Sequence, residues 1–250
     1  QKCYPQQNKY FGNIWVSPSL TQVNLVEFDP DAELKILAGI IFHQTHCGWT
    51  TARLSAASMS VNEKRDLFNR YLLNRTARWQ KVGRAFENSY LRFEIVMDIG
   101  AYRDLHRHRM MTQERQRFST HHGFEIPSEV KEAGLSEKFS EALEKVDALF
   151  KKLEKEDVEL AQYAVPLAYR IRFYEWQNFR QFFWEAELRT TSQGHPNYRF
   201  IEQEKYRLVK EKFPLLAEFM LVDMNKYDVA RRGTEEKIEE KEKKILEGLK

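Results

Sequence analysis

The segment His106-Arg107-His108-Arg109 contains four consecutive side chains that can each bind an anion. A guanidinium offers a planar fork of donors that matches phosphate or carboxylate, and an imidazole adds a donor whose charge is set near neutral pH. On a helix, consecutive side chains point ~100° apart and would fan around a bound anion. The residue types therefore predict a phosphate-bearing ligand. The alternative is a surface cluster that pairs with acids such as Asp104 and Glu114.

This basic segment follows the clearest strand pattern in the chain, from Tyr90 to Asp98. Its apolar positions, Leu91, Phe93, Ile95 and Met97, alternate with polar ones. A period of two places one face of a strand on the core. We therefore expect a buried strand to hold the basic segment at its end.

Periodicity predicts the other elements. Short strands are expected at Val23 to Phe28 and at Leu167 to Phe173. Helices are expected from Asp31 to about Cys47, and over Ser55 to Gln80, Ser136 to Leu153, Trp176 to Leu188 and Phe200 to Tyr227. Residues 1–22 are interpreted as a leader or linker, 23–230 as one domain, and 231–250 as a charged helical tail.

Composition limits the classes of protein to consider. The 250 residues carry a net charge of only +3 although 31% are charged, so a polybasic nucleic-acid binder is not expected. No apolar run approaches the ~18 residues that a membrane helix needs, and no secretory signal opens the chain. We expect a cytoplasmic protein without a membrane or nucleic-acid partner, in which Cys3 and Cys47 remain reduced.

His43, His46 and Cys47 lie three and four residues apart and would share a helix face, where they could ligate zinc. No fourth ligand follows at a suggestive spacing. Capping or buried roles are the preferred interpretation, and no metal site is predicted.

Several segments together resemble the flavin-dependent thymidylate synthases (ThyX), over about Val23 to Tyr227. The segments that carry the resemblance are Ala85-Phe86-Glu87-Asn88, Arg107-His108-Arg109, Gln113 to Phe118, Ala161 to Pro166, Asn178-Phe179-Arg180 and Arg189. The resemblance implies an α+β fold with a mixed, mainly antiparallel sheet and long flanking helices. It also implies a homotetramer with sites between subunits, or a pseudo-tetramer with a sister domain.

The resemblance further implies reductive methylation of dUMP with methylenetetrahydrofolate, FAD and NADPH. By resemblance, Arg107, His108, Arg109, Asn178 and Arg180 would bind the flavin cofactor. The nucleotide, dUMP or another pyrimidine nucleotide, would be bound by Arg107, Glu114, Arg115, Arg117 and Arg189. No single catalytic residue is assigned.

Departures from the family pattern concentrate on the nucleotide side. Arg115 stands where the family has a serine, and Asp104 replaces a glutamine before the triplet. Gln162 replaces an arginine, His195-Pro196 replaces Ala-Gln, and Arg84 replaces a small hydroxyl residue. Several lost contacts of about 1.5–3 kcal/mol each would weaken dUMP binding by orders of magnitude.

Two functional hypotheses therefore remain open. The chain is either a flavin-dependent thymidylate synthase with an altered site, or a non-catalytic structural or regulatory domain of a larger assembly. The start at Gln1, without methionine, favours a piece of a tandem protein.

Overall fold

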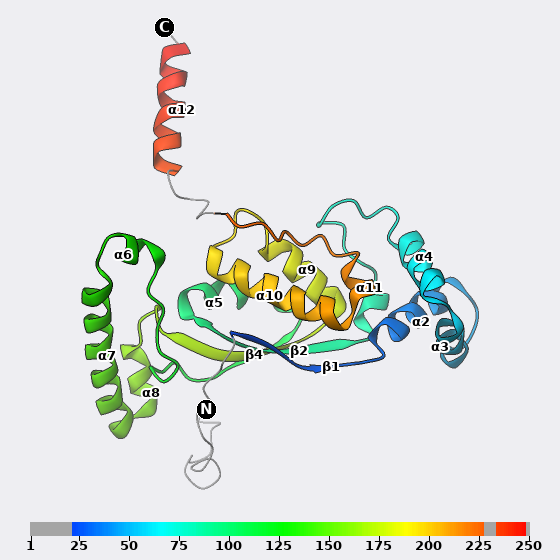
Figure 1. Cartoon of the computed structure of the whole chain (residues 1–250), viewed down its shortest axis with the longest axis horizontal. Helices are drawn as coiled ribbons and strands as arrows, with labels where there is room; N and C mark the ends of the chain where they lie inside the picture. Colours follow the sequence, from blue (N-terminus) through cyan, green and yellow to red (C-terminus); the bar gives the residue numbers. More distant parts are fainter. Residues whose placement is uncertain (1–21, 228–233, 249–250) are drawn as a thin grey trace.

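A four-stranded antiparallel sheet organises the chain, of which the computed structural model describes residues 22–227 and 234–248 (Figure 1). Its order is β1-β2-β4-β3, with bounds β1 (Val23–Phe28), β2 (Tyr90–Asp98), β4 (Arg170–Asn178) and β3 (Thr112–Arg115). Each neighbouring pair is antiparallel, and β2 and β4 pair along their full length from Tyr90 opposite Asn178 to Asp98 opposite Arg170. The expected α+β fold is confirmed.

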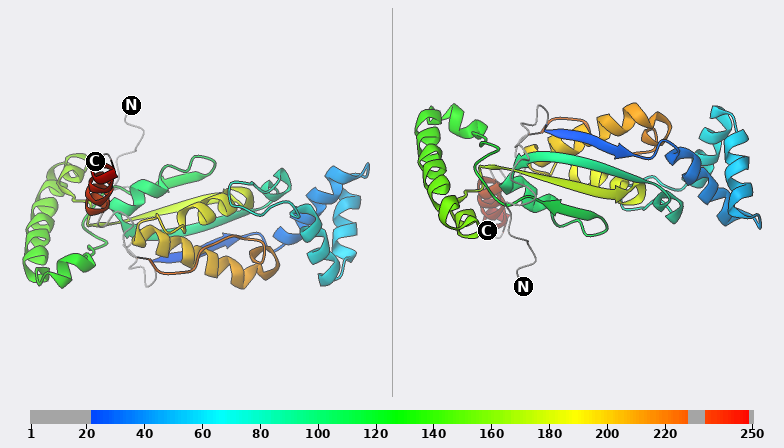
Figure 2. Two further views of the ribbon diagram at one scale, coloured as in Figure 1. Left: turned by 90° about the horizontal axis from the view of Figure 1, so that it is seen from above. Right: turned by 90° about the horizontal axis from the view of Figure 1, so that it is seen from below.

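Helices cover one face of this sheet. α9 (Phe179–Arg189) and α10 (Pro196–Lys212) lie along it, with α5 (Ile99–Leu105) and α11 (Pro214–Ala217) beside them (Figures 1 and 2). The core-facing residues Leu91, Phe93 and Ile95 of β2 are fully buried against these helices, as their alternation predicts. The sheet therefore holds the loop after α5 and the β4–α9 junction in fixed positions.

Short helices form the end of the molecule near α2 in Figure 1. α2 (Ala32–Gln44), α3 (Trp49–Ser58), α4 (Val61–Tyr71) and the 3-10 turn η1 (Arg84–Glu87) lie here. α4 begins at a capping box, in which the Ser60 side chain accepts from the Glu63 amide and Glu63 reaches back to Ser60.

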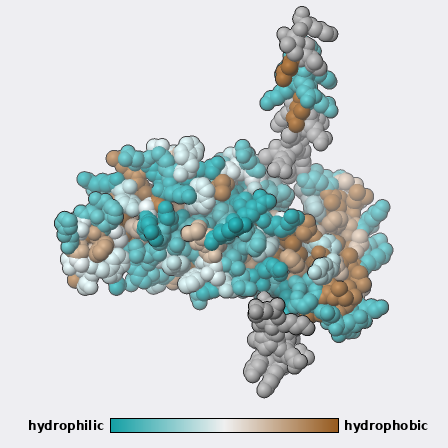
Figure 3. All heavy atoms as spheres, turned by 180° about the vertical axis from the view of Figure 1, so that it is seen from behind, coloured by the Kyte–Doolittle hydropathy of each residue, from teal (hydrophilic) through white to brown (hydrophobic). Residues whose placement is uncertain are grey.

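The opposite end is an arm of α6 (Ser128–Glu132), α7 (Ser136–Glu156), α8 (Val158–Ala161) and η2 (Gln162–Ala164). Apolar side chains gather over α7 and α8 at the right of Figure 3. Leu149 and Leu160, on these helices, are about half exposed, at 49% and 52%. The predicted tail contains α12 (Thr234–Gly248), which projects away from the sheet in Figure 1.

Some predicted boundaries are wrong. The helix expected over Ser55 to Gln80 is divided at Ser60, whose side chain caps a new helix, and α4 ends at Tyr71. The first predicted helix ends at Gln44, before Cys47. The last, over Phe200 to Tyr227, is interrupted at Phe213 because Pro214 starts the separate helix α11.

The second long strand is also displaced from its prediction. It begins at Arg170 and continues to Asn178, so Trp176 lies in β4 and not in the following helix. Glu175 and Gln177 occupy core-facing positions, and these polar residues conceal the continuing alternation.

The predicted leader, including Cys3, lies outside the described residues except for Gln22. Among the described helices, none combines the length and apolar character needed to cross a membrane.

Candidate functional site

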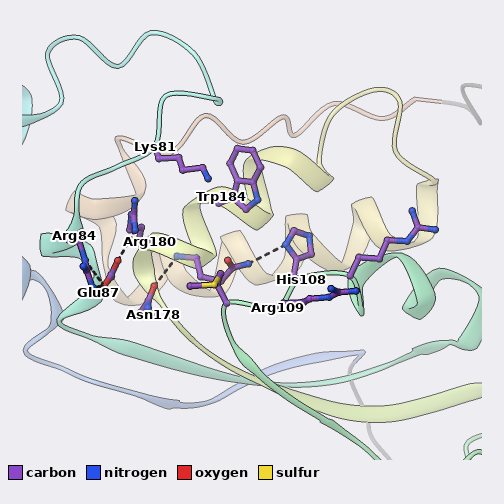
Figure 4. A pocket seen from close by; sticks show the side chains of 11 residues that line it. Lys81, Arg84, Glu87, His108, Arg109, Asn178, Arg180 and Trp184 are labelled. Carbon is purple, nitrogen blue, oxygen red and sulfur yellow. Dashed lines mark hydrogen bonds and ion pairs between the residues drawn. The ribbon is translucent and has the colours of Figure 1, made fainter.

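A pocket of about 580 Å³ opens where three segments meet (Figure 4). The segment that leads into β2 contributes Lys81, Arg84 and Glu87. The loop between α5 and β3 contributes residues 107–110, and the β4–α9 junction contributes Asn178, Arg180, Gln181 and Trp184. The structure thus brings together all five residues predicted to bind the cofactor: Arg107, His108, Arg109, Asn178 and Arg180.

The pocket is strongly cationic. Its lining includes the basic side chains of Lys81, Arg84, Arg107, Arg109 and Arg180, against the single carboxylate of Glu87. A wall of this composition favours a ligand with more than one negative charge.

Glu87 is engaged by two arginines of the lining. Its Oε2 accepts from Arg84 Nη2 at 3.0 Å, and its Oε1 accepts from Arg180 Nη1 at 2.7 Å. Partial burial would raise the pKa of Glu87, but these hydrogen bonds outweigh it and lower the pKa. The carboxylate is therefore ionised and orients Arg180, whose Nε also donates to the carbonyl of Val82 at 3.0 Å.

Asn178 closes the pocket at the start of α9. Its Oδ1 accepts from the backbone amide of Gln181 at 2.9 Å, which makes it the N-cap of this helix. The first turn of α9 therefore faces the pocket with its partial positive charge. A phosphate would be favoured there both by the helix terminus and by Arg180.

His108 forms the inner wall and is only 9% exposed. Its Nε2 accepts from Arg189 Nε at 2.8 Å, and its Nδ1 lies 3.2 Å from the side-chain amide nitrogen of Gln181 (Figure 4). Because a guanidinium can only donate, Nε2 must be unprotonated and the ring proton belongs on Nδ1, so the Gln181 amide must turn its oxygen toward Nδ1 to accept this proton. Burial lowers the pKa of His108, Glu185 opposes this, and Arg189 lowers it further. His108 is therefore a neutral imidazole.

The residues predicted to bind the nucleotide do not converge on the pocket, apart from Arg107. Arg189 is directed to His108 and to the carbonyl oxygen of Asp104, at 2.5 Å. Arg115 lies over the Phe118 ring at 4.2 Å, and Arg117 pairs with Glu159. Glu114 lies on β3 opposite Tyr174. Within this one chain, these side chains therefore do not form a shared site with the cationic pocket.

A fully buried charge cluster lies beside His108, between the sheet and helices α9 and α10. Lys205 Nζ donates to Glu175 at 2.6 Å, to Glu185 at 2.9 Å and to Glu202 at 3.0 Å, and none of these side chains is exposed. In the described part of the chain, these carboxylates are the one acidic group with metal-ligand spacing, and Lys205 occupies its centre.

The cluster contains three carboxyl groups and only one ammonium group, so some of its carboxyl groups retain their protons. Burial and the charge of Glu185 raise the pKa of Glu175 to about 7, against the effect of Lys205. Burial raises the pKa of Glu202 well above its usual range. Burial also acts to raise the pKa of Glu185, but Lys205 outweighs it and keeps this carboxylate ionised.

Comparison with known proteins decides the family. Residues 25–215 match the family model described as thymidylate synthase complementing protein. The chain belongs to this family. The resemblance to ThyX recognised from Arg107-His108-Arg109 is therefore confirmed.

Curated relatives are longer than this chain. It is 36% identical over 220 residues to a UPF0159 protein of Chlamydia pneumoniae, covering 88% of this chain and 41% of that protein. It is 35% identical over 216 residues to a UPF0159 protein of Chlamydia muridarum, covering 86% and 41%. The chain thus spans about two fifths of the length of these relatives.

Among solved structures, a UMP/dUMP methylase PolB from Streptomyces cacaoi bound with 5-Br dUMP has the same fold. The TM-score is 0.61 at 17% identity, over 80% of this chain and 96% of that one. The same methylase with 5-Br UMP gives a TM-score of 0.59.

The departures from the thymidylate synthase complementing pattern have structural partners within the chain. Gln162 Oε1 accepts from the Phe118 amide at 3.0 Å, and its Nε2 donates to Glu159. His195 is the N-cap of α10, with Pro196 in its first turn. Asp104 pairs with Arg107 at 3.4 Å, so its charge is partly neutralised.

Sequence reasoning missed part of the pocket and the whole buried cluster. Lys81 and Trp184 carry no spacing that links them to the triplet, because the fold alone brings them together, and Arg84 was noted only as a departure from the family pattern. The cluster did leave a signal. Glu175 continues the core-facing alternation of Ile171 and Phe173, and a carboxylate at such a position requires a buried partner.

Proposed function

We propose that this chain is a ThyX-type domain that binds FAD and a pyrimidine nucleotide for the reductive methylation of dUMP with methylenetetrahydrofolate, NADPH being the reductant. One observation carries the proposal: the Arg107-His108-Arg109 triplet and the Asn178–Arg180 junction, far apart in sequence, line a single cationic pocket. The triplet, Asn178 and Arg180 would hold the phosphates of the flavin cofactor. The flavin supplies the reducing hydride when bound.

The pocket fits a diphosphate group. Among the described residues no ion pair engages Arg109 or Lys81, and the first turn of α9 adds oriented amides. The Glu87 carboxylate is already held between two arginines, so it orients them more than it repels an anion. These features support FAD as the occupant.

A pyrimidine nucleotide is the proposed second ligand. The Streptomyces cacaoi protein with the same fold is a UMP/dUMP methylase bound with 5-Br dUMP, which supports this choice. Glu114, Arg115, Arg117 and Arg189 are proposed as its partners. Because they lie apart in this chain, a complete nucleotide site would need side chains from more than one copy or domain.

Homo-oligomerisation, as a tetramer or a pseudo-tetramer with a sister domain, is part of the proposal. The half-exposed Leu149 and Leu160 on the α7–α8 arm support it, because apolar groups gathered on one surface favour association (Figure 3).

The second candidate function is a non-catalytic domain in a larger assembly. It is favoured by Arg189, because two of its five N–H donors bind His108 and the Asp104 carbonyl and hold the side chain against the protein. On this proposal the chain would retain flavin binding or oligomerisation without turnover.

The deciding experiment measures flavin and turnover separately. The purified chain is incubated with FAD, desalted and scanned for flavin absorbance, then treated with NADPH and assayed for dUMP-dependent tritium release. Bound flavin that NADPH bleaches, with tritium release, supports the enzyme. Bound flavin without release supports the non-catalytic domain. A colourless chain that takes up no FAD would overturn the flavin proposal.

A further inference from the structure

One wall of the cationic pocket is aromatic. Trp184 lies one turn after Arg180 on α9, so the two side chains share the helix face that borders the pocket (Figure 4). The neighbouring rings Phe179, Phe182 and Phe183 are fully buried in the core. Trp184 is only partly buried, and it is the aromatic side chain of α9 that lines the pocket.

Lys81 covers this indole. Its Nζ lies 4.7 Å from the centroid of the Trp184 ring, and the two side chains meet at the upper rim of the pocket (Figure 4). Lys81 is exposed and belongs to the irregular segment between α4 and η1. The contact of an exposed lysine with a partly buried indole is weak, so Lys81 can leave the ring at little cost.

A ligand that carries both a ring and phosphates could use both residues at once. Stacking of a heteroaromatic ring on an aromatic side chain contributes more binding free energy than the contact of an exposed cation with that side chain. The displaced ammonium would remain within the same pocket as Arg84 and Arg180, where it can pair with a phosphate.

We infer that Trp184 is the ring-stacking residue of the pocket: it takes the adenine ring of an adenine nucleotide diphosphate, and Lys81 moves from the indole to the phosphates. This inference rests on the proposed phosphate pocket and extends it by naming the residue that distinguishes an adenine-bearing ligand from a bare anion. An adenine is favoured over a pyrimidine because a purine offers the larger stacking face.

Binding of ADP and of inorganic pyrophosphate to the full chain tests the inference, by calorimetry and by tryptophan fluorescence. Trp184→Ala should weaken ADP binding roughly 5- to 150-fold, the equivalent of about 1–3 kcal/mol, and leave pyrophosphate binding unchanged. Trp184→Phe should restore most of the ADP affinity.

Trp79→Ala is the matched control, because Trp79 is 71% exposed and does not line the pocket. Its ADP affinity should equal that of the unmodified chain. Equal ADP affinity in Trp184→Ala, with pyrophosphate still bound, overturns the stacking inference and leaves the phosphate pocket standing. If the unmodified chain binds neither ADP nor pyrophosphate, the proposed phosphate site fails as well. Retained pyrophosphate binding by Trp184→Ala shows that its loss of ADP affinity does not come from misfolding.

Discussion

Arg189 donates from Nε to Nε2 of His108 over 2.8 Å, so the two residues bind each other directly. The family pattern assigns them to different ligands, His108 to the flavin side and Arg189 to the nucleotide base. Their contact fixes the imidazole tautomer and places a permanent cation behind the pocket wall. The chain therefore holds His108 neutral and holds the Arg189 side chain against it.

The first prediction concerns the protonation of His108. Arg189→Met should raise the pKa of the imidazole, because it removes a positive charge and frees Nε2 to accept a proton. An NMR titration of the His108 ring measures this shift. Arg107→Met is the control, since Arg107 pairs with Asp104 at the surface and should leave the pKa nearly unchanged. An unchanged or lower pKa in Arg189→Met would contradict the assigned tautomer.

The second prediction concerns the pH dependence of stability. The pKa of Glu175 is raised to about 7, so its protonated form stabilises the folded chain. This contribution is complete below the ordinary pKa of 4.5 and is lost as the pH rises through about 7. The Glu175→Gln side chain is neutral at every pH in this window, so the variant does not lose this stability. The free energy of unfolding of the native chain should therefore fall by up to ~3 kcal/mol relative to the variant across this window.

Denaturant titrations of both proteins at a series of pH values measure this difference. His108 titrates in both proteins, so its contribution largely cancels in the comparison, whereas that of Glu202 changes because the charge of Glu175 raises the pKa of Glu202. A difference that stays constant over the whole window would show that Glu175 does not exchange its proton there.

The third prediction concerns Lys205. Lys205→Met leaves three buried carboxylates without their cation and should cost on the order of 3–5 kcal/mol in the free energy of unfolding. Lys151→Met removes a lysine from an exposed pair with Asp147 and should cost far less. Adding Glu185→Gln to Lys205→Met should recover part of the loss, because Glu185 is the carboxylate kept ionised. Equal losses for the two lysine variants would refute a structural role for the cluster.

The sequence alone was enough to predict most of the sheet. The alternation from Tyr90 to Asp98 matches β2 residue for residue, because its core-facing side chains are all apolar. β4 was misplaced because Glu175 and Gln177 face the core in apolar positions, and their cost is offset by partners on α9 and α10 that no local pattern reveals. The local pattern of polar and apolar residues gave a wrong prediction here, because hydrogen bonds to distant elements decide which side chains are buried.

The candidate site was predictable only where residues are adjacent in sequence. The triplet and the Asn178–Arg180 pair were found, and the fold brings them to one pocket. Lys81, Arg84 and Trp184 join them through packing between distant elements, which a single sequence does not encode locally. Their roles, like those of all the predicted site residues, remain predictions.

The fourth prediction concerns Arg109, which has no ion pair with the described residues and lines the pocket. Arg109→Met should weaken pyrophosphate binding roughly 10- to 150-fold, as expected for one charge-assisted hydrogen bond of about 1.5–3 kcal/mol. The salt dependence of binding should fall as well. Arg70→Met, at an exposed pair with Asp66 away from the pocket, is the control and should bind normally. Unchanged affinity in Arg109→Met would exclude this arginine from the anion site.

The last prediction separates two roles of Asn178, the N-cap of α9 and a wall of the pocket. Asn178→Ala removes the cap and should cost about 1 kcal/mol in the free energy of unfolding. Asn178→Asp keeps an equally good cap and should leave stability nearly unchanged, because a carboxylate suits a helix N-terminus. The same carboxylate would face Arg180 and occupy the position proposed for phosphate, so pyrophosphate binding should fall sharply. Unfolding and calorimetric titration of both variants test this, and normal anion binding by Asn178→Asp would leave Asn178 a purely structural cap.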